Sequence, residues 1–242
     1  MKNIKKIICA GCCIVLGVLV TAGAVNMQTK QEEPSSKTVI DRENNSTVYT
    51  IRSESSLATD ISDPSKMADM SQYVAIVRVD SVDGVSNYSD VSQEYVSAYT
   101  YGSLTVLENI KGNLPVNEKL EFYRLGGAIS VDEYVKSLSD MEKMQYERAK
   151  ENDGSLAMAD YIEVLNTDDI RIESGKTYLV YMIDEAAYKN KPDTYAIIGF
   201  KGGLREVQAK VKTDDIQTFY NSSVKILNNF TGEWEGLDSV VE

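Results

Sequence analysis

The sequence predicts a mainly β fold of the α+β class, a five- to six-stranded antiparallel barrel with an inserted amphipathic helix and a C-terminal helix. Apolar runs of strand length, each bounded by glycine, asparagine or aspartate, recur along residues 73–212. They do not alternate regularly with helices, which argues against a doubly wound parallel sheet. An antiparallel sheet of this size hides its edges when it closes on itself, so a small barrel is expected.

The composition is that of a globular protein, and it excludes several chemistries. The chain has 242 residues, 43% of them hydrophobic, a net charge of −12 and no histidine. Without histidine there is no Ser–His–Asp or Cys–His nucleophile and no His-ligated zinc. The acidic balance disfavours nucleic acid, whose phosphates are bound by clustered lysine and arginine. We therefore expect no nucleic-acid partner, no cofactor and no metal ion, and we assign no catalytic residue.

Residues 1–24 are expected to direct the chain out of the cytoplasm. Three lysines precede an uncharged apolar run over residues 7–25, which is the layout of an export signal. Ala22 and Ala24 form the pair of small residues that a signal peptidase requires, so cleavage after Ala24 is the leading interpretation. The apolar run is also about as long as a membrane span, so an uncleaved transmembrane anchor is the alternative.

All three cysteines, Cys9, Cys12 and Cys13, lie within this first segment. Cys12 follows Ala10-Gly11 as in a lipoprotein signal, although Cys9 stands where leucine or valine is usual, so lipidation is a third alternative. Each alternative places the protein outside the cytoplasm, either secreted or anchored to the cell membrane through this segment alone. The exported part then has no cysteine and no intramolecular disulfide.

The exported part divides into three regions. Residues 25–62 are polar and predict a flexible linker, within which residues 47–52 alternate like a short edge strand. The barrel domain is expected over residues 63–230, and an acidic tail over 231–242. A short helix is predicted to begin at Asp63 and Pro64 and to end near residue 71.

The first half of the domain predicts three strands. They cover residues 73–82, 98–110 and 119–125. Residues 85–97 are polar and are expected to form a loop, and Gly102 within the second strand predicts a bulge or bend. A Gly-Gly pair ends the third strand.

The second half begins with a helical insertion. Ser130 and Glu133 have the spacing of a capping box, and apolar residues at helical spacing continue to about residue 152. Residues 155–165 are ambiguous between a second helix and an irregular segment. Three further strands and a final amphipathic helix are expected over residues 176–184, 193–200, 204–212 and 214–228.

Four motifs of this chain resemble those of a group of exported bacterial domains of unknown function. They are YVAIVRVDSV, LTVLENIKGN, the Gly-Gly pair after the third strand, and SGKTYLVYM. Such domains look like small OB-type barrels, akin to the netrin-like domain of tissue metalloprotease inhibitors. The resemblance implies an OB-like barrel exported by a Gram-positive bacterium. Those inhibitors insert an N-terminal cysteine into the enzyme's zinc site, and the exported part here has no cysteine, so that mechanism does not carry over.

Tyrosines are the candidate binding residues. Tyr95, Tyr99, Tyr101 and Tyr123 fall on or beside neighbouring predicted strands, where their rings would stack sugars or peptide side chains. The competing interpretation is that tyrosine is simply a good strand former with a solvated hydroxyl. Trp234, the single tryptophan, lies in the acidic tail. It is expected either to remain exposed as a contact residue or to fold back onto the barrel.

Acidic residues are weaker candidates. Asp168, Asp169 and Glu173 lack the spacing of a calcium loop and are interpreted as solvated surface acids. The expected function is therefore a non-enzymatic extracytoplasmic domain that binds an unidentified cell-envelope or extracellular ligand or protein. The alternative is a hydrolase that uses carboxylates alone and acts on cell-envelope polysaccharide.

Overall fold

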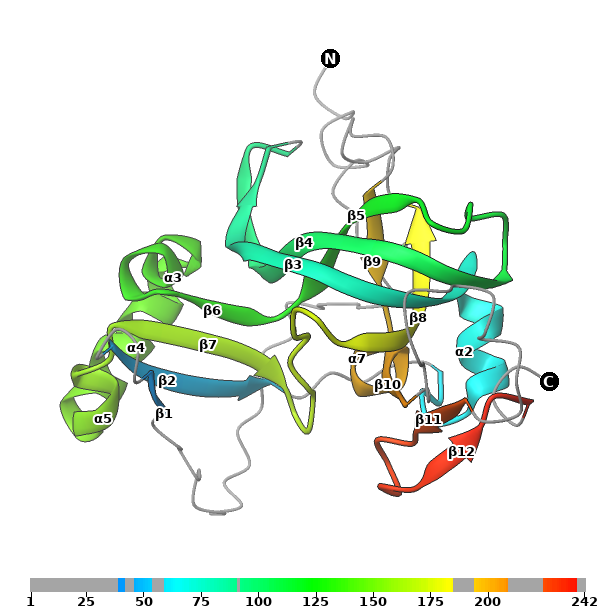
Figure 1. Ribbon diagram of the computed structural model, residues 1–242. Coiled ribbons are helices and arrows are strands. Elements are labelled where there is room, and N and C mark those ends of the chain that lie inside the picture. Colours follow the sequence, from blue (N-terminus) through cyan, green and yellow to red (C-terminus); the bar gives the residue numbers. More distant parts are fainter. Residues whose placement is uncertain are drawn as a thin grey trace.

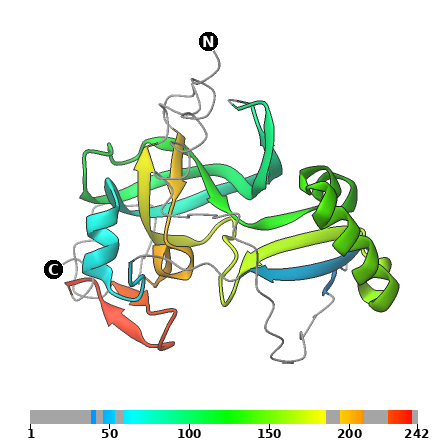
Figure 2. The same cartoon turned by 180° about the vertical axis from the view of Figure 1, so that it is seen from behind.

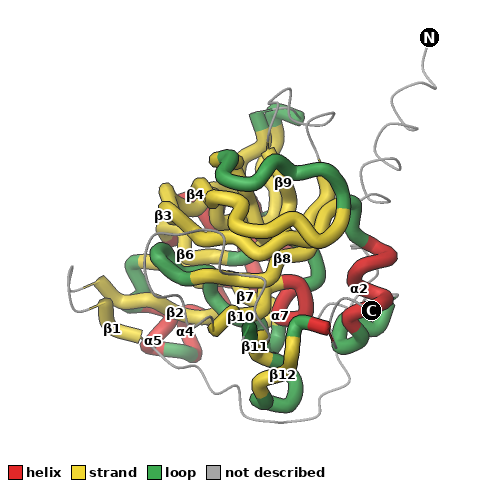
Figure 3. Tube along the Cα trace, turned by 45° about the vertical axis from the view of Figure 1, so that its right-hand side comes forward, coloured by secondary structure: helices red, strands yellow, loops and turns green. Residues whose placement is uncertain are grey.

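The computed structural model describes residues 39–41, 46–53, 59–90, 92–184, 194–208 and 224–238. The predicted export segment over residues 1–24 and most of the predicted C-terminal helix over 214–228 lie outside the described residues. Strands make up most of the described chain, so the mainly β prediction is confirmed (Figure 3). The strands form two sheets, one of eight strands and one of four.

The larger sheet contains the strands predicted from residue 73 onward. Its order is β12 (Trp234–Gly236), β11 (Lys225–Leu227), β10 (Leu204–Gln208), β8 (Thr177–Asp184), β3 (Tyr73–Ser89), β4 (Glu94–Lys111), β5 (Lys119–Leu125) and β9 (Thr194–Ile197). β9 runs parallel to β5, and it also pairs antiparallel with β8. The pairings therefore lead from β3 through β4, β5, β9 and β8 back to β3.

The β3–β4 hairpin is longer than the sequence predicts. β3 extends to Ser89 and β4 begins at Glu94, so the loop expected over residues 85–97 is wrong except at the turn itself. The bulge predicted near Gly102 is confirmed, because the register shifts by one residue between Val82 and Gly84 of the partner strand. A Cβ on Gly102 would lie 2.1 Å from the Ser81 carbonyl oxygen, so only glycine fits this close approach.

The smaller sheet was not predicted. Its order is β1 (Val39–Asp41), β2 (Ser46–Ser53), β7 (Tyr161–Asn166) and β6 (Gly127–Ser130). The strand expected over residues 47–52 is present as β2, but it pairs parallel with β7 rather than with an edge of the larger sheet. The ambiguous residues 155–165 hold the end of helix α5 (Gly154–Ala157) and most of β7.

The chain passes from the larger sheet to the smaller one at the Gly-Gly pair. Gly126 and Gly127 have φ angles of +96° and +139°, which residues with a side chain rarely adopt. A Cβ on Gly127 would also lie 2.6 Å from the hydroxyl oxygen of Thr100. The pair therefore does more than end β5, because it lets β6 start at once in the other sheet.

The inserted helix is broken into two. α3 (Val131–Ser137) and α4 (Asp140–Asn152) are separated by Leu138, whose backbone is extended. The hydroxyl of Ser130 accepts from the Glu133 N–H at 3.3 Å, but the complete capping box is formed by Ser139 at the start of α4. A second N-cap inside the predicted helix thus ends the first segment and starts another.

Each sheet has its own apolar core. The larger sheet packs Val77, Leu104, Phe122 and Val180 in one cluster and packs α2 (Pro64–Met70) on another through Met67. The smaller sheet packs Ile162 against α3, α4 and α5, which gather at the opposite end of the molecule from α2 (Figures 1 and 2). The two sheets therefore fold around separate cores and meet between them.

The C-terminal part corrects the predicted helix at its end. Residues 225–227 form β11, which pairs with β10 and β12, so a helix reaching residue 228 is wrong there. Ile226 is fully buried in this arrangement, which explains its apolar character without a helix. A short helix, α7 (Phe200–Gly203), leads into β10.

In the part of the chain that the structure describes, no helix has both the length and the apolar character that a membrane crossing requires.

Candidate functional site

Three of the predicted tyrosines meet on neighbouring strands. Tyr99 and Tyr101 lie two residues apart on β4, which places them on one face, and their ring centroids are 6.3 Å apart. Tyr123 on β5 lies directly opposite Tyr101 in the strand register. The Tyr123 ring meets Tyr99 edge to face, with the ring centroids 5.8 Å apart.

Two more tyrosines extend this group toward the turn of the hairpin. Tyr95, which was predicted, pairs across the strands with Tyr88, and their ring centroids are 5.4 Å apart. The hydroxyl of Tyr99 donates to the Tyr88 carbonyl at 2.9 Å and joins the two groups. Tyr88 is not among the predicted binding residues because the sequence predicts a loop over residues 85–97, whereas continued alternation past Gly84 would indicate it. We call Tyr88, Tyr95, Tyr99, Tyr101 and Tyr123 the tyrosine face.

The tyrosines of the tyrosine face differ in how far their side chains are exposed to solvent. Tyr95 and Tyr101 are 41% and 40% exposed, Tyr88 and Tyr99 are half-buried, and Tyr123 is buried. Tyr123 packs with Ile183 and Ala196 beneath the others. The exposed rings can therefore contact a ligand, and Tyr123 supports them from below.

Trp234 does not join the tyrosine face. It lies on β12, the outer strand of the larger sheet, opposite Leu227 in the register. Figure 1 shows β12 at the lower right and the turn of the β3–β4 hairpin at the upper left. Trp234 is 40% exposed, so it neither folds into the core nor contributes to the tyrosine group.

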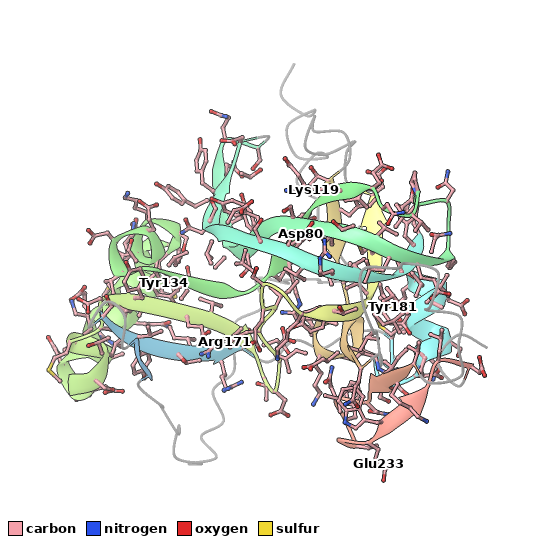
Figure 4. All side chains as sticks on the ribbon, viewed as in Figure 1. Asp80, Lys119, Tyr134, Arg171, Tyr181 and Glu233 are labelled. Carbon is pink, nitrogen blue, oxygen red and sulfur yellow. The ribbon has the colours of Figure 1, made fainter. Side chains whose placement is uncertain are left out.

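A concave site lies elsewhere, where the two sheets meet. It has a volume of about 650 Å³ and is lined from both sheets and from the loop between β7 and β8. We call it the junction pocket, and Figure 4 shows Arg171 close to the ends of β2 and β7. Its charged lining residues are Arg52, Glu163, Asp169, Arg171, Glu173, Lys176 and Glu206.

Glu163 on β7 accepts three side-chain hydrogen bonds in the junction pocket. Arg171 donates to it twice, from Nε to Oε1 at 2.5 Å and from Nη2 to Oε2 at 2.7 Å, and Thr50 donates at 2.9 Å. Burial alone would raise the pKa of Glu163, but the hydrogen bonds from Arg171 and Thr50 outweigh it and keep this pKa below its ordinary value. Glu163 is therefore ionised and fixed at neutral pH.

Lys176 bridges two acids on the other side of the pocket. Its Nζ lies 3.0 Å from Glu173 Oε1 and 3.2 Å from Glu206 Oε2. Hydrogen bonds to Glu173 and then to Glu206 raise the pKa of Lys176, so the lysine stays charged. All three side chains remain partly exposed to solvent.

Asp169 corrects the expectation of a surface acid. Its side chain is fully buried, and it accepts from Arg124 Nη2 at 2.6 Å. The backbone turns at Asp168, where φ is +60°, and so brings Asp169 inward. Arg124 lies on β5, 45 residues earlier, so sequence spacing gave no sign of this pair.

The carboxylates of the junction pocket are not arranged as a hydrolytic pair. A general acid needs a raised pKa, whereas the pKa of Glu163 is lowered. Asp169 is held by Arg124, and Glu173 and Glu206 share Lys176. Within the described residues, no three or more Cys, Asp or Glu side chains come together as a metal site either.

No protein-family model matches the chain, and no curated protein matches its sequence. The resemblance to exported OB-type domains thus stays a prediction, and function is inferred from the residues and their arrangement.

Proposed function

We propose that this chain is an exported, non-enzymatic binding domain that holds a neutral, elongated ligand, a cell-envelope oligosaccharide, on its tyrosine face. The observation that carries the proposal is the run of contacts from Tyr101 through Tyr99 to Tyr123 across β4 and β5. Tyr101 and Tyr99 present their accessible ring atoms along β4, where successive sugar units can stack, and the buried Tyr123 supports them.

The strand order supports an OB-like barrel for this domain. The five strands β3, β4, β5, β9 and β8 pair in a closed cycle with one parallel pair, β5 with β9. In an OB barrel the second and third strands carry the ligand. The corresponding strands here are β4 and β5, which hold four of the five residues of the tyrosine face.

The chemistry of the tyrosine face favours sugars over charged polymers. A tyrosine ring stacks on the C–H face of a sugar, and its hydroxyl bonds to the sugar hydroxyls. The net charge of −12 repels polyanions and so disfavours nucleic acid or an anionic wall polymer. The predicted leader would place this surface in the envelope, where neutral polysaccharide is abundant.

The test is binding of the full-length protein to purified neutral cell-wall polysaccharide and its oligosaccharides, followed by isothermal titration calorimetry. Replacing both exposed rings, Tyr95→Ala with Tyr101→Ala, is expected to weaken binding by about tenfold or more, as for a contact hot spot. Tyr161→Ala is the matched control, because Tyr161 is 39% exposed but lies on β7 of the other sheet. Equal binding by the double variant and the control would overturn the proposal.

The same incubation tests the absence of catalysis. New reducing ends, abolished by Glu163→Gln, would replace the binding function with the hydrolase alternative. Export is tested by fractionating the native host and sequencing the N-terminus of the recovered protein. A mature chain that begins at Val25 is the expected result, and recovery from the cytosol contradicts export.

A further inference from the structure

The junction pocket is a second concave site, separate from the tyrosine face. Its volume of about 650 Å³ falls within the range of small-molecule sites, roughly 300–1,000 Å³. Its walls come from β2 and β7 on one side and from β8, β10 and β11 on the other, with the connecting loop between them. A ligand placed there would contact both sheets at once.

The charges of the pocket separate into two groups. On the β2–β7 side, Arg52 and Arg171 accompany one carboxylate, Glu163, so this side is net positive. On the β8–β10 side, Glu173 and Glu206 share one lysine, Lys176, so this side is net negative. The pocket thus presents groups of both signs, which meet at the loop before β8, where Arg171 and Glu173 interact electrostatically.

Each group keeps hydrogen-bonding capacity that the protein itself does not use. The Arg52 side chain makes no hydrogen bond or ion pair within the described ranges, although its charge helps to lower the pKa of Glu163. Arg171 uses Nε and Nη2 but not Nη1. Glu173 accepts from Lys176 through Oε1 alone, and Glu206 through Oε2 alone. Donors are therefore free on one side and carboxylate oxygens on the other.

We propose that the junction pocket binds a small zwitterion of the amino acid or short-peptide class. The ligand's carboxylate lies at Arg52 and Arg171, whose planar guanidinium groups match a carboxylate in geometry. The ligand's ammonium lies at the carboxylate oxygens that Lys176 does not use, Glu173 Oε2 and Glu206 Oε1. A simple anion or a simple cation would satisfy only one of these groups, and a neutral sugar neither, so the pocket favours a ligand that carries both charges.

The test compares peptides that differ by one charge. Trialanine, N-acetyl-trialanine, trialanine amide and free alanine are titrated into the full-length protein by NMR or calorimetry. Trialanine or alanine is expected to bind, and each cap is expected to weaken trialanine by about tenfold or more, as for loss of one partner of a charge pair. Equal affinity of free and capped peptides, or no binding of any of the four, overturns the proposal.

Variants then assign each charge to its wall. Arg52→Gln is expected to weaken trialanine by about tenfold while leaving the amide unchanged, and Glu206→Gln is expected to do the same with respect to the N-acetyl peptide. Arg78→Gln is the matched control, because Arg78 is exposed on β3 and outside the pocket lining. If Arg52→Gln weakens all peptides equally while its unfolding midpoint is unchanged, the assignment is wrong.

The two binding proposals fail independently. The Tyr95→Ala and Tyr101→Ala double variant is expected to bind trialanine like the unaltered protein, because neither residue lines the junction pocket. Loss of peptide binding in that variant would overturn the separation of the two sites.

Discussion

Arg124 and Asp169 form a buried ion pair that ties β5 of the larger sheet to the loop that arrives from the smaller one. Arg124 Nη2 lies 2.6 Å from Asp169 Oδ1, and Arg124 Nη1 donates to the Ile170 carbonyl at 2.9 Å. The loop starts at the end of β7 and leads into β8, so this contact fixes the segment that joins the two sheets. The shape of the junction pocket depends on it, because Asp169, Ile170 and Arg171 all line the pocket.

Replacing Arg124 is therefore expected to destabilise the whole fold. Arg124→Met leaves the Asp169 carboxylate buried without its partner, which typically costs about 3–5 kcal/mol of unfolding free energy. Urea unfolding followed by circular dichroism measures this loss. The control is Arg78→Gln, which breaks an exposed pair with Asp80 and should cost about 1 kcal/mol or less. A loss below 1 kcal/mol in Arg124→Met would show that the pair is not what holds the loop.

The second prediction concerns the stability effect of replacing Gly102, which lies opposite the bulge. Gly102→Ala would place a methyl group 2.1 Å from the backbone oxygen of Ser81, so the β3–β4 hairpin must shift, at a cost of about 1–3 kcal/mol. Gly154→Ala is the matched control, because no atom lies within 4 Å of the added Cβ. That control is expected to be neutral or to stabilise by up to about 1 kcal/mol through the unfolded state. Equal unfolding midpoints for the two variants would contradict the close approach at Gly102.

The third prediction concerns the N-cap of α4 at the break between α3 and α4. Ser139 accepts from the Glu142 N–H and donates its own backbone N–H to the Glu142 carboxylate, so the pair caps α4. Ser139→Ala is expected to cost about 1 kcal/mol of unfolding free energy. Ser137→Ala removes only a bond to the Tyr134 carbonyl and serves as the control. If both serine variants unfold alike, the α4 cap does not contribute to stability.

The parts of this fold that could be predicted are the elements whose signal lies in the local sequence pattern. The strands over residues 73–82 and 176–184 contain the apolar runs 73–77 and 178–183, and α2 begins at an Asp63 cap followed by Pro64, so each was found from the sequence. The alternation of Tyr99 and Tyr101 likewise placed both rings on one face of β4. Local spacing was sufficient because each of these signals lies within one element.

What could not be predicted depends on partners distant in the chain. β7 is stabilised by pairing with β2, more than a hundred residues earlier, as the bond of Thr50 to Glu163 illustrates. The hairpin extends past residue 85 because polar Asn87 is buried and donates to the Glu133 carbonyl of α3. The burial of Asp169 depends in the same way on Arg124. In each case the sequence predicts an exposed polar residue, because the distant partner that allows its burial is not evident from the sequence.

Glu108 on β4 makes a prediction about pH. The residue is buried, its Oε2 has no hydrogen-bond partner among the described residues, and burial raises its pKa above the ordinary 4.5. Between 4.5 and the raised value, the folded state binds more protons than the unfolded state, so stability falls as pH rises. The penalty is complete above the raised pKa and absent well below 4.5. Glu108→Gln removes the charge, so it is expected to stabilise the protein at neutral pH and to have little effect in acid.

Glu163 gives the opposite slope and serves as the control for Glu108. Its pKa is lowered by Arg171 and Thr50 against the effect of burial, so its contribution is present above 4.5 and is lost as pH falls through the lowered pKa. Glu163→Gln should therefore destabilise the protein at neutral pH, with a difference that shrinks as the solution becomes acidic. Urea unfolding of both variants between about pH 2 and pH 8 measures the two slopes. If Glu108→Gln also destabilises at neutral pH, then Glu108 is ionised and partnered in solution, and its burial carries no electrostatic penalty.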